Sequence, residues 1–174
     1  MFYNRSVFAE LFGLVILDLA GLAAFQRAHN LGEDLLESFT SLDLGEEVSE
    51  KGIAIPITGI PGDYYHWAVC NLASESSHLK EEQVVVKSEG WILHTPQGEA
   101  TVCGMGYLKK FDVDYFANSD KFVRLQLPAG WNEVTIVGGI DDAEHLVYEL
   151  RVTSTLVKPD FSGDFNDNFS ITAD

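Results

Sequence analysis

The sequence predicts a mainly β fold, an antiparallel β-sandwich with one or two short helices near the N-terminus. From Gly52 onward, apolar and polar residues alternate with a period of two, which is typical of strands that bury one face. In the second half of the chain, turn signals recur about every 8–12 residues, a spacing typical of sandwiches. A chain of 174 residues has the length of one domain, which we expect to span residues 1–174.

The first expected element is a buried strand in "FGLVILDLA", residues 12–20. The uninterrupted apolar run from Leu11 to Leu17 lies between Glu10 and Asp18. It is too short to cross a bilayer and is at the short limit for the apolar part of a signal peptide. We therefore expect a central strand of a cytoplasmic protein. An exported protein with an N-terminal signal peptide is the alternative.

A helical insertion is expected at residues 20–40. Leu22 and Phe25 fit one helical face, and the apolar residues of the segment 35–39 fit the face of a second short helix. The following stretch, "SLDLGEEVSEKG" at residues 41–52, is rich in charged and small residues. We interpret it as a polar connector between the helices and the strands.

Three hairpins are expected after residue 52, because pairs of alternating segments are joined by the turns "IPGD", "PQGE" and "PAG". The first of these strands contains Pro56, which lacks a backbone N–H and therefore belongs at a sheet edge or a bulge. A further alternating strand follows the loop "IDDAE". The expected pairs are residues 52–59 with 64–72, 89–95 with 100–106, and 121–127 with 131–139, and the last strand is 145–154.

The charge balance points to the class of partner. The chain has 27 acidic and 11 basic residues and a formal net charge of −16. This excess disfavours binding to nucleic acid or to an anionic membrane, whose phosphates require Lys and Arg. It favours rapid capture of a protein with a basic surface. The alternative is that the charge serves solubility alone.

Three acidic segments are the candidate partner-binding surfaces. Between residues 33 and 50 there are seven acids and no base. The loop 141–144 and the tail 156–174 are also acidic, and in the tail phenylalanines alternate with aspartates, so we expect some of the rings to pack on the sandwich. The candidate partner-binding residues are Glu33, Asp34, Glu37, Glu46, Glu47, Asp141, Asp142, Glu144, Asp160, Asp164 and Asp167.

No pattern in the sequence indicates catalysis. The G-x-S-x-G, H-E-x-x-H, Walker and dinucleotide-binding motifs are all missing, and the five histidines lack the short spacing of metal ligands. Asp112 and Asp114 are expected on one face of a strand, whereas a glycosidase places its carboxylates on two sides of a cleft. We therefore expect no catalytic residue, no metal and no cofactor. Cys70 and Cys103 lie in apolar segments and are expected to be buried free thiols, with a disulfide as the alternative in an exported protein.

Three stretches, "GLVILDLAGL", "IPITGIPGDYYHWAVC" and "VRLQLPAGWNEVTIV", carry a resemblance. Their order resembles that in small bacterial β-sandwich proteins of the immunity and nuclease-inhibitor type, such as the competence nuclease inhibitors. The resemblance implies a non-catalytic protein that binds and blocks a toxic enzyme, with a nuclease as the expected target.

A ligand-binding sandwich is the alternative function. A carbohydrate could stack on aromatic rings of one sandwich face, with Tyr65 and Trp67 on one face of their strand and Tyr64 on the other. The candidate stacking residues are Tyr64, Tyr65, Trp67, Trp91 and Trp131. The tail segment "DFSGDFNDN" is rich in oxygen ligands for calcium, although it does not have the spacing of an EF-hand loop.

Overall fold

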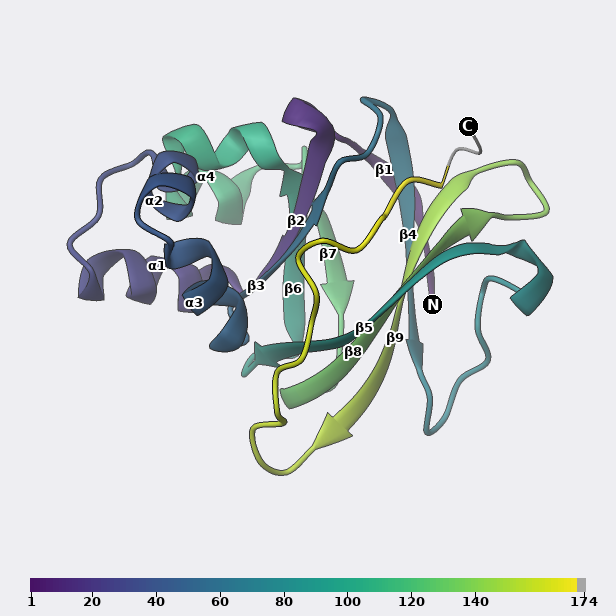
Figure 1. The fold of residues 1–174 in the computed structure, drawn as a ribbon. Helices are drawn as coiled ribbons and strands as arrows, with labels where there is room; N and C mark the ends of the chain where they lie inside the picture. Colours follow the sequence, from purple (N-terminus) through teal and green to yellow (C-terminus); the bar gives the residue numbers. More distant parts are fainter. Residues whose placement is uncertain (172–174) are drawn as a thin grey trace.

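The computed structural model describes residues 1–171 and contains two β-sheets (Figure 1). The mainly β class is therefore confirmed. The five-stranded sheet has the order β1-β4-β9-β8-β5 and the four-stranded sheet the order β3-β2-β6-β7. The strands are β1 (Phe2–Phe8), β2 (Gly13–Leu17), β3 (Ala54–Thr58), β4 (Tyr64–Asn71), β5 (Val84–Thr95), β6 (Glu99–Gly104), β7 (Val123–Gln126), β8 (Gly130–Ile140) and β9 (Leu146–Thr155).

The helices are not confined to the N-terminal region, which corrects the prediction. The segment 41–52, expected to be a connector, contains a helix, and so does "FDVDYF", expected to be a strand. Figure 1 shows the four α-helices together at one end of the molecule. Within residues 1–171 no helix is both long enough and apolar enough to span a bilayer. The helices are α1 (Leu19–Ala28), α2 (Leu35–Ser41), α3 (Leu44–Glu50) and α4 (Val113–Asn118), with 3-10 turns η1 (Glu10–Phe12), η2 (Glu81–Gln83) and η3 (Met105–Lys110).

A shared apolar core lies between the two sheets, as in a β-sandwich. The four-stranded sheet contributes buried residues such as Ile16 and Ile55, and the five-stranded sheet contributes Trp67, Ile136 and Tyr148. The alternation read from the sequence is thus confirmed, since the residues expected to face inward on β3, β7, β8 and β9 lie in this core.

A second core lies between the other face of the four-stranded sheet and the helices. Val15 and Cys103 project from the sheet into this core and meet Phe25, Leu35 and Phe116 from the helical side. The four-stranded sheet is therefore covered on both faces. This explains why all five residues of β2 are buried and why its sequence is apolar without alternation.

The three predicted hairpins are wrong, although the strands themselves exist. β3 pairs with β2, and β4 pairs with β1 and β9, so the turn "IPGD" carries the chain from one sheet to the other. The turns between β5 and β6 and between β7 and β8 do the same. In residues 1–171 only β8 and β9 are neighbouring strands joined by a short turn. The five-stranded sheet is also mixed, because β4 and β9 run parallel.

Two smaller expectations are confirmed. β2 is flanked by β3 and β6, so it is a central strand. β3, which contains Pro56, lies at the edge of the four-stranded sheet.

The tail packs against the sandwich through its phenylalanines, as expected. Figure 1 shows residues 156–171 running across the side of the molecule where β3 and β5 lie. The Trp91 ring lies 5.7, 5.4 and 6.4 Å from those of Phe161, Phe165 and Phe169, between ring centroids. The Tyr148 hydroxyl donates a hydrogen bond of 2.6 Å to the Phe169 carbonyl. The tail therefore forms part of the core, without forming a strand.

Candidate functional site

The predicted partner-binding residues fall into three separate groups. The acids of residues 33–50 lie on and around α2 and α3, and those of residues 141–144 lie in the β8–β9 turn. Figure 1 places these two groups at opposite ends of the molecule, with the tail acids between them. The three segments therefore do not form one continuous surface.

The β8–β9 turn is organised around Asp141. Its carboxylate is 8% exposed and accepts hydrogen bonds from the backbone N–H groups of Ala143 and His145, each at 2.9 Å. The rings of His78 and His145 lie within 3.1 Å of the same carboxylate. Burial favours the neutral acid, but these hydrogen bonds outweigh it and lower the pKa of Asp141 to about 2. This carboxylate therefore holds the turn together.

The other acids of this turn differ in their surroundings. Asp142 is exposed and accepts hydrogen bonds from Lys80 and Gln83, both at 2.8 Å. Glu144 is exposed and adopts a left-handed backbone conformation.

In the tail, Asp160 and Asp164 are exposed, and Asp164 accepts a hydrogen bond from the backbone N–H of Asn166. Asp167 accepts a hydrogen bond from the Ser88 hydroxyl, which in turn accepts one from the Trp91 indole N–H.

Around α2 and α3, two of the seven acids have partners within the protein. Asp34 begins α2, and its side chain accepts a hydrogen bond from the Glu37 backbone N–H. Glu47 forms an ion pair of 2.6 Å with Lys51 and lies 3.4 Å from the His29 ring. The hydrogen bond from Lys51 is the main cause of the lowered pKa of Glu47.

The remaining five acids form what we call the acidic helical surface. All of them are exposed, and none makes an ion pair within the described part of the chain. The exposed Lys109 and Lys110, at the end of η3, lie near Glu33, the first of these acids. The next residue, Phe111, donates its backbone N–H to the Glu33 carbonyl. The acidic helical surface consists of Glu33, Glu37, Asp43, Glu46 and Glu50.

An apolar groove of about 280 Å³ opens beside the acidic helical surface. It lies between α2–α3 and the helix-covered face of the four-stranded sheet, and Phe165 of the tail forms part of its wall. Asp43 and Glu46 line it as well. Its other apolar lining residues include Val15, Leu36, Phe39, Val48, Met105 and Leu108. The sequence pattern does not indicate this groove, although the apolar face expected for residues 35–39 forms one side of it.

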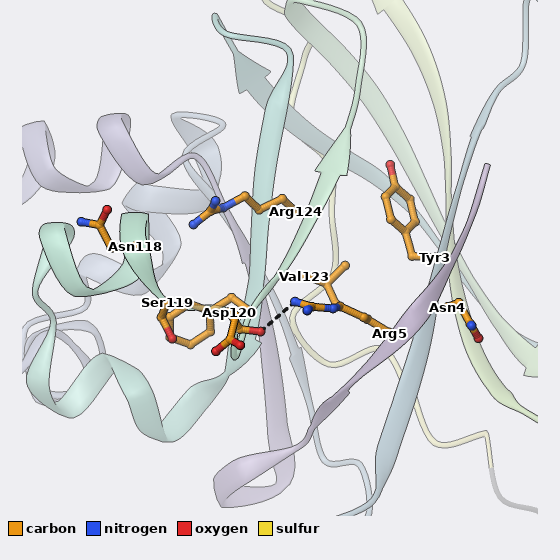
Figure 2. Close-up of a pocket in the computed structure, with 9 residues that line it drawn as sticks. Tyr3, Asn4, Arg5, Asn118, Ser119, Asp120, Val123 and Arg124 are labelled. Atoms are coloured by element: carbon orange, nitrogen blue, oxygen red, sulfur yellow. Dashed lines mark hydrogen bonds between the residues drawn. The ribbon is translucent and has the colours of Figure 1, made fainter.

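A second cavity, of about 390 Å³, lies between the outer strands β1 and β7 (Figure 2). Arg5 and Arg124 line it, which would suit an anion. Both guanidinium groups, however, donate to backbone carbonyls, one in the last turn of α4 and one just after the helix. Arg5 bonds the Asp120 carbonyl at 2.9 Å and Arg124 the Phe116 carbonyl at 3.1 Å. These arginines therefore fasten α4 to the sandwich, in the position where a helix C-terminus favours cations.

Histidine and aromatic rings gather beside the β8–β9 turn. Phe2 stacks on His78 with centroids 4.3 Å apart, and His66 lies 4.3 Å from His145. In residues 1–171, no group of three or more His, Cys, Asp or Glu side chains is arranged to hold a metal ion. The ring contacts of Phe2 pack the edge of the five-stranded sheet at β1.

The structure gives little support to the other predicted chemistry. Of the five candidate stacking residues, Tyr65, Trp67 and Trp91 are buried and cannot stack on a carbohydrate, whereas Tyr64 and Trp131 reach the surface. Asp112 caps α4 by accepting from the backbone N–H groups of Asp114 and Tyr115, so the expected pair of strand carboxylates does not exist. Cys70 and Cys103 are buried free thiols in different sheets, as expected.

No known protein family matches the sequence, and no curated protein is similar to it. Among solved structures, the chain is similar to ComJ from Bacillus subtilis, an inhibitor of the DNA-degrading activity of NucA. The alignment covers 89% of this chain and 98% of ComJ, with 11% sequence identity and a TM-score of 0.43. A TM-score of this size does not by itself establish a shared fold or a shared activity. The resemblance to competence nuclease inhibitors that the sequence motifs carry is confirmed in the structural comparison, as a weak likeness.

Proposed function

We propose that this protein is a non-catalytic, cytoplasmic inhibitor or immunity protein. It binds a toxic enzyme with a basic surface, a nuclease in the first instance, and blocks its active site. The observation that carries the proposal is the acidic helical surface, whose five exposed carboxylates have no ion-pair partner within residues 1–171. The proposal does not rest on the weak likeness to ComJ.

The charge arrangement suits this target. An enzyme that cleaves nucleic acid presents Lys and Arg to the phosphates of its substrate. Carboxylates that project from short helices can occupy the same positions as those phosphates. The net charge of −16 attracts a basic enzyme from a distance and raises the association rate. Salt screens this attraction over about 8 Å at physiological ionic strength, so association is expected to slow as salt is raised.

Binding kinetics with the product of the neighbouring gene, taken as the candidate toxin, test the proposal. We compare Glu33→Gln/Glu37→Gln with the control Glu82→Gln/Glu133→Gln, which removes the same charge from exposed residues elsewhere. The first pair is expected to slow association by roughly two- to fivefold and the control to leave it nearly unchanged. Exposed charges contribute little to stability, so both variants should remain folded.

Two results would contradict the proposal. One is the absence of both binding and inhibition with the wild-type protein. The other is an equal loss of association rate in both variants, which would mean that net charge alone, and not the acidic helical surface, attracts the enzyme.

A further inference from the structure

We propose that the apolar groove beside the acidic helical surface receives a long basic side chain, lysine or arginine, from the partner protein. This inference rests on the proposed function and assigns a specific contact within it. Three features of the groove select such a side chain: its apolar walls, the carboxylates of Asp43 and Glu46, and the hydroxyl of Ser49.

The walls suit the methylene stem of the side chain. Leu36 and Phe39 of α2, Val48 of α3, and Met105 and Leu108 of η3 line the groove. Lysine and arginine bury their stems along apolar surface while the charged end remains near polar groups. Each buried methylene group raises the affinity by about fourfold.

The carboxylate of Asp43 is free to bind the charged end. Each of the four α-helices in residues 1–171 begins after an aspartate, and the aspartates before α1, α2 and α4 accept hydrogen bonds from the first turn of their helix. Asp43 precedes α3 but makes no such bond, because its backbone is in the left-handed region with φ 57°. Asp43 and Glu46 therefore present acceptors to a cation in the groove.

Ser49 supplies the second, independent indication of a ligand. It lines the groove and is 0% exposed, and its hydroxyl has no hydrogen-bond partner in the described part of the chain. A buried hydroxyl without a partner is unfavourable. A guanidinium or ammonium group between Ser49 and the carboxylates would donate a hydrogen bond to it. A purely apolar occupant would leave this hydroxyl without a donor.

Small probes test the groove without the partner. In an NMR titration of the full chain labelled with ¹⁵N, n-butylguanidinium carries stem and charge, guanidinium carries the charge alone, and 1-pentanol carries a neutral stem. We expect saturable shifts of the α3 backbone amides with n-butylguanidinium, with a Kd of about 1–20 mM. The other two probes should bind at least about tenfold more weakly, since each lacks one of the two interactions.

Variants locate the interaction. Asp43→Asn/Glu46→Gln should weaken n-butylguanidinium binding by about three- to tenfold, and Ser49→Ala by about fivefold. The pair Glu82→Gln/Glu133→Gln is the control of equal charge and should bind the probe as the wild type does. The proposal is overturned if 1-pentanol binds as tightly as n-butylguanidinium, if no saturable shift occurs, or if the control pair weakens binding equally.

Binding measurements with the partner protein distinguish a failure of this inference from a failure of the proposed function. If the toxin binds the wild type but Asp43→Asn/Glu46→Gln leaves its dissociation rate unchanged, the groove assignment is wrong while the inhibitor function stands. If the probe binds in the groove but no toxin binds or is inhibited, the proposed function is wrong. A dissociation rate raised by about tenfold in Asp43→Asn/Glu46→Gln would support both.

Discussion

Replacing Phe169 by alanine tests whether the C-terminal tail is part of the core. The Phe169 ring is 1% exposed and belongs to the core between the two sheets. Removing a buried phenylalanine side chain costs about 3–5 kcal/mol through lost burial and the cavity that remains. The hydrogen bond from Tyr148 is retained, because it ends on the backbone carbonyl of residue 169. A domain of this size has a free energy of unfolding of about 5–15 kcal/mol, so the loss is a large fraction of the total.

Urea unfolding followed by tryptophan fluorescence measures this loss, since Trp91 lies beside the tail. At about 2–4 °C for each kcal/mol, the Tm should fall by roughly 6–20 °C. Phe169→Leu, which retains most of the volume, should cost less than about 1.5 kcal/mol and remains measurable if the alanine variant does not fold. Asp160→Ala, at an exposed tail position, should cost less than about 0.5 kcal/mol. A loss below about 1 kcal/mol for Phe169→Ala would refute the assignment of the tail to the core.

Three further predictions concern backbone contact, pH and thiol chemistry. Gly139→Ala places a Cβ 2.1 Å from the Gln83 carbonyl oxygen and should lower the free energy of unfolding by at least about 2 kcal/mol, whereas Gly32→Ala meets no atom within 4 Å and should be nearly neutral in the same urea assay. The pKa of Asp141 is lowered from 3.8 to about 2, so its contribution, on the order of 2 kcal/mol, is present above pH 4 and lost as the pH falls from 4 to 2. Unfolding curves across that range should show a smaller acid-dependent loss in Asp141→Asn than in the wild type, and an equal loss would contradict the assignment. Both cysteines are buried, so a thiol reagent should react with them only as fast as the protein unfolds, and immediate reaction of the native protein would contradict this burial.

The sequence predicted which residues face the core, because that information is local. The alternation of Val123 and Leu125 with polar neighbours places one face of β7 in the core whatever strand lies beside it. Pro56 likewise indicates an edge strand through a property of the residue itself, since it has no N–H to donate to a neighbouring strand.

Strand partners could not be predicted in this way. A short turn between two alternating segments can form a hairpin or carry the chain to the opposite sheet, and both arrangements bury the same residues. Asn132 lies at the start of β8, directly after the turn from β7, and is 0% exposed. Its side-chain amide donates to the carbonyls of Pro128 and Gly130 and to the Thr95 hydroxyl. This buried amide holds the turn where it crosses between the sheets. Asn132 shares the inward face of β8 with Val134 and Ile136, so a polar residue on this otherwise apolar face is the local sign of that crossing.

The candidate site, too, could be predicted only where its features depend on local sequence. The sequence identifies acidic segments but not which carboxylates have partners within the protein. Asp34 caps a helix that the sequence did predict, so its role could have been recognised from its position. The partner of Asp141, His78, lies 63 residues away in the sequence, so their contact depends on the pairing of strands. The groove depends even more on tertiary structure, because its walls come from a sheet, two helices, a 3-10 turn and the tail.

The tail connects the stability of the sandwich with the proposed binding surface. Phe165 lies 5.4 Å from Trp91, between ring centroids, and also lines the groove beside α2 and α3. The tail segment that covers the core between the sheets therefore also completes the wall of the groove. Because Phe165 lines the same groove as Asp43 and Glu46 of the acidic helical surface, an enzyme that fills the groove would contact the tail as well. Partner binding should then stabilise the docked tail, and loss of the docked tail should weaken partner binding, since the two equilibria are linked.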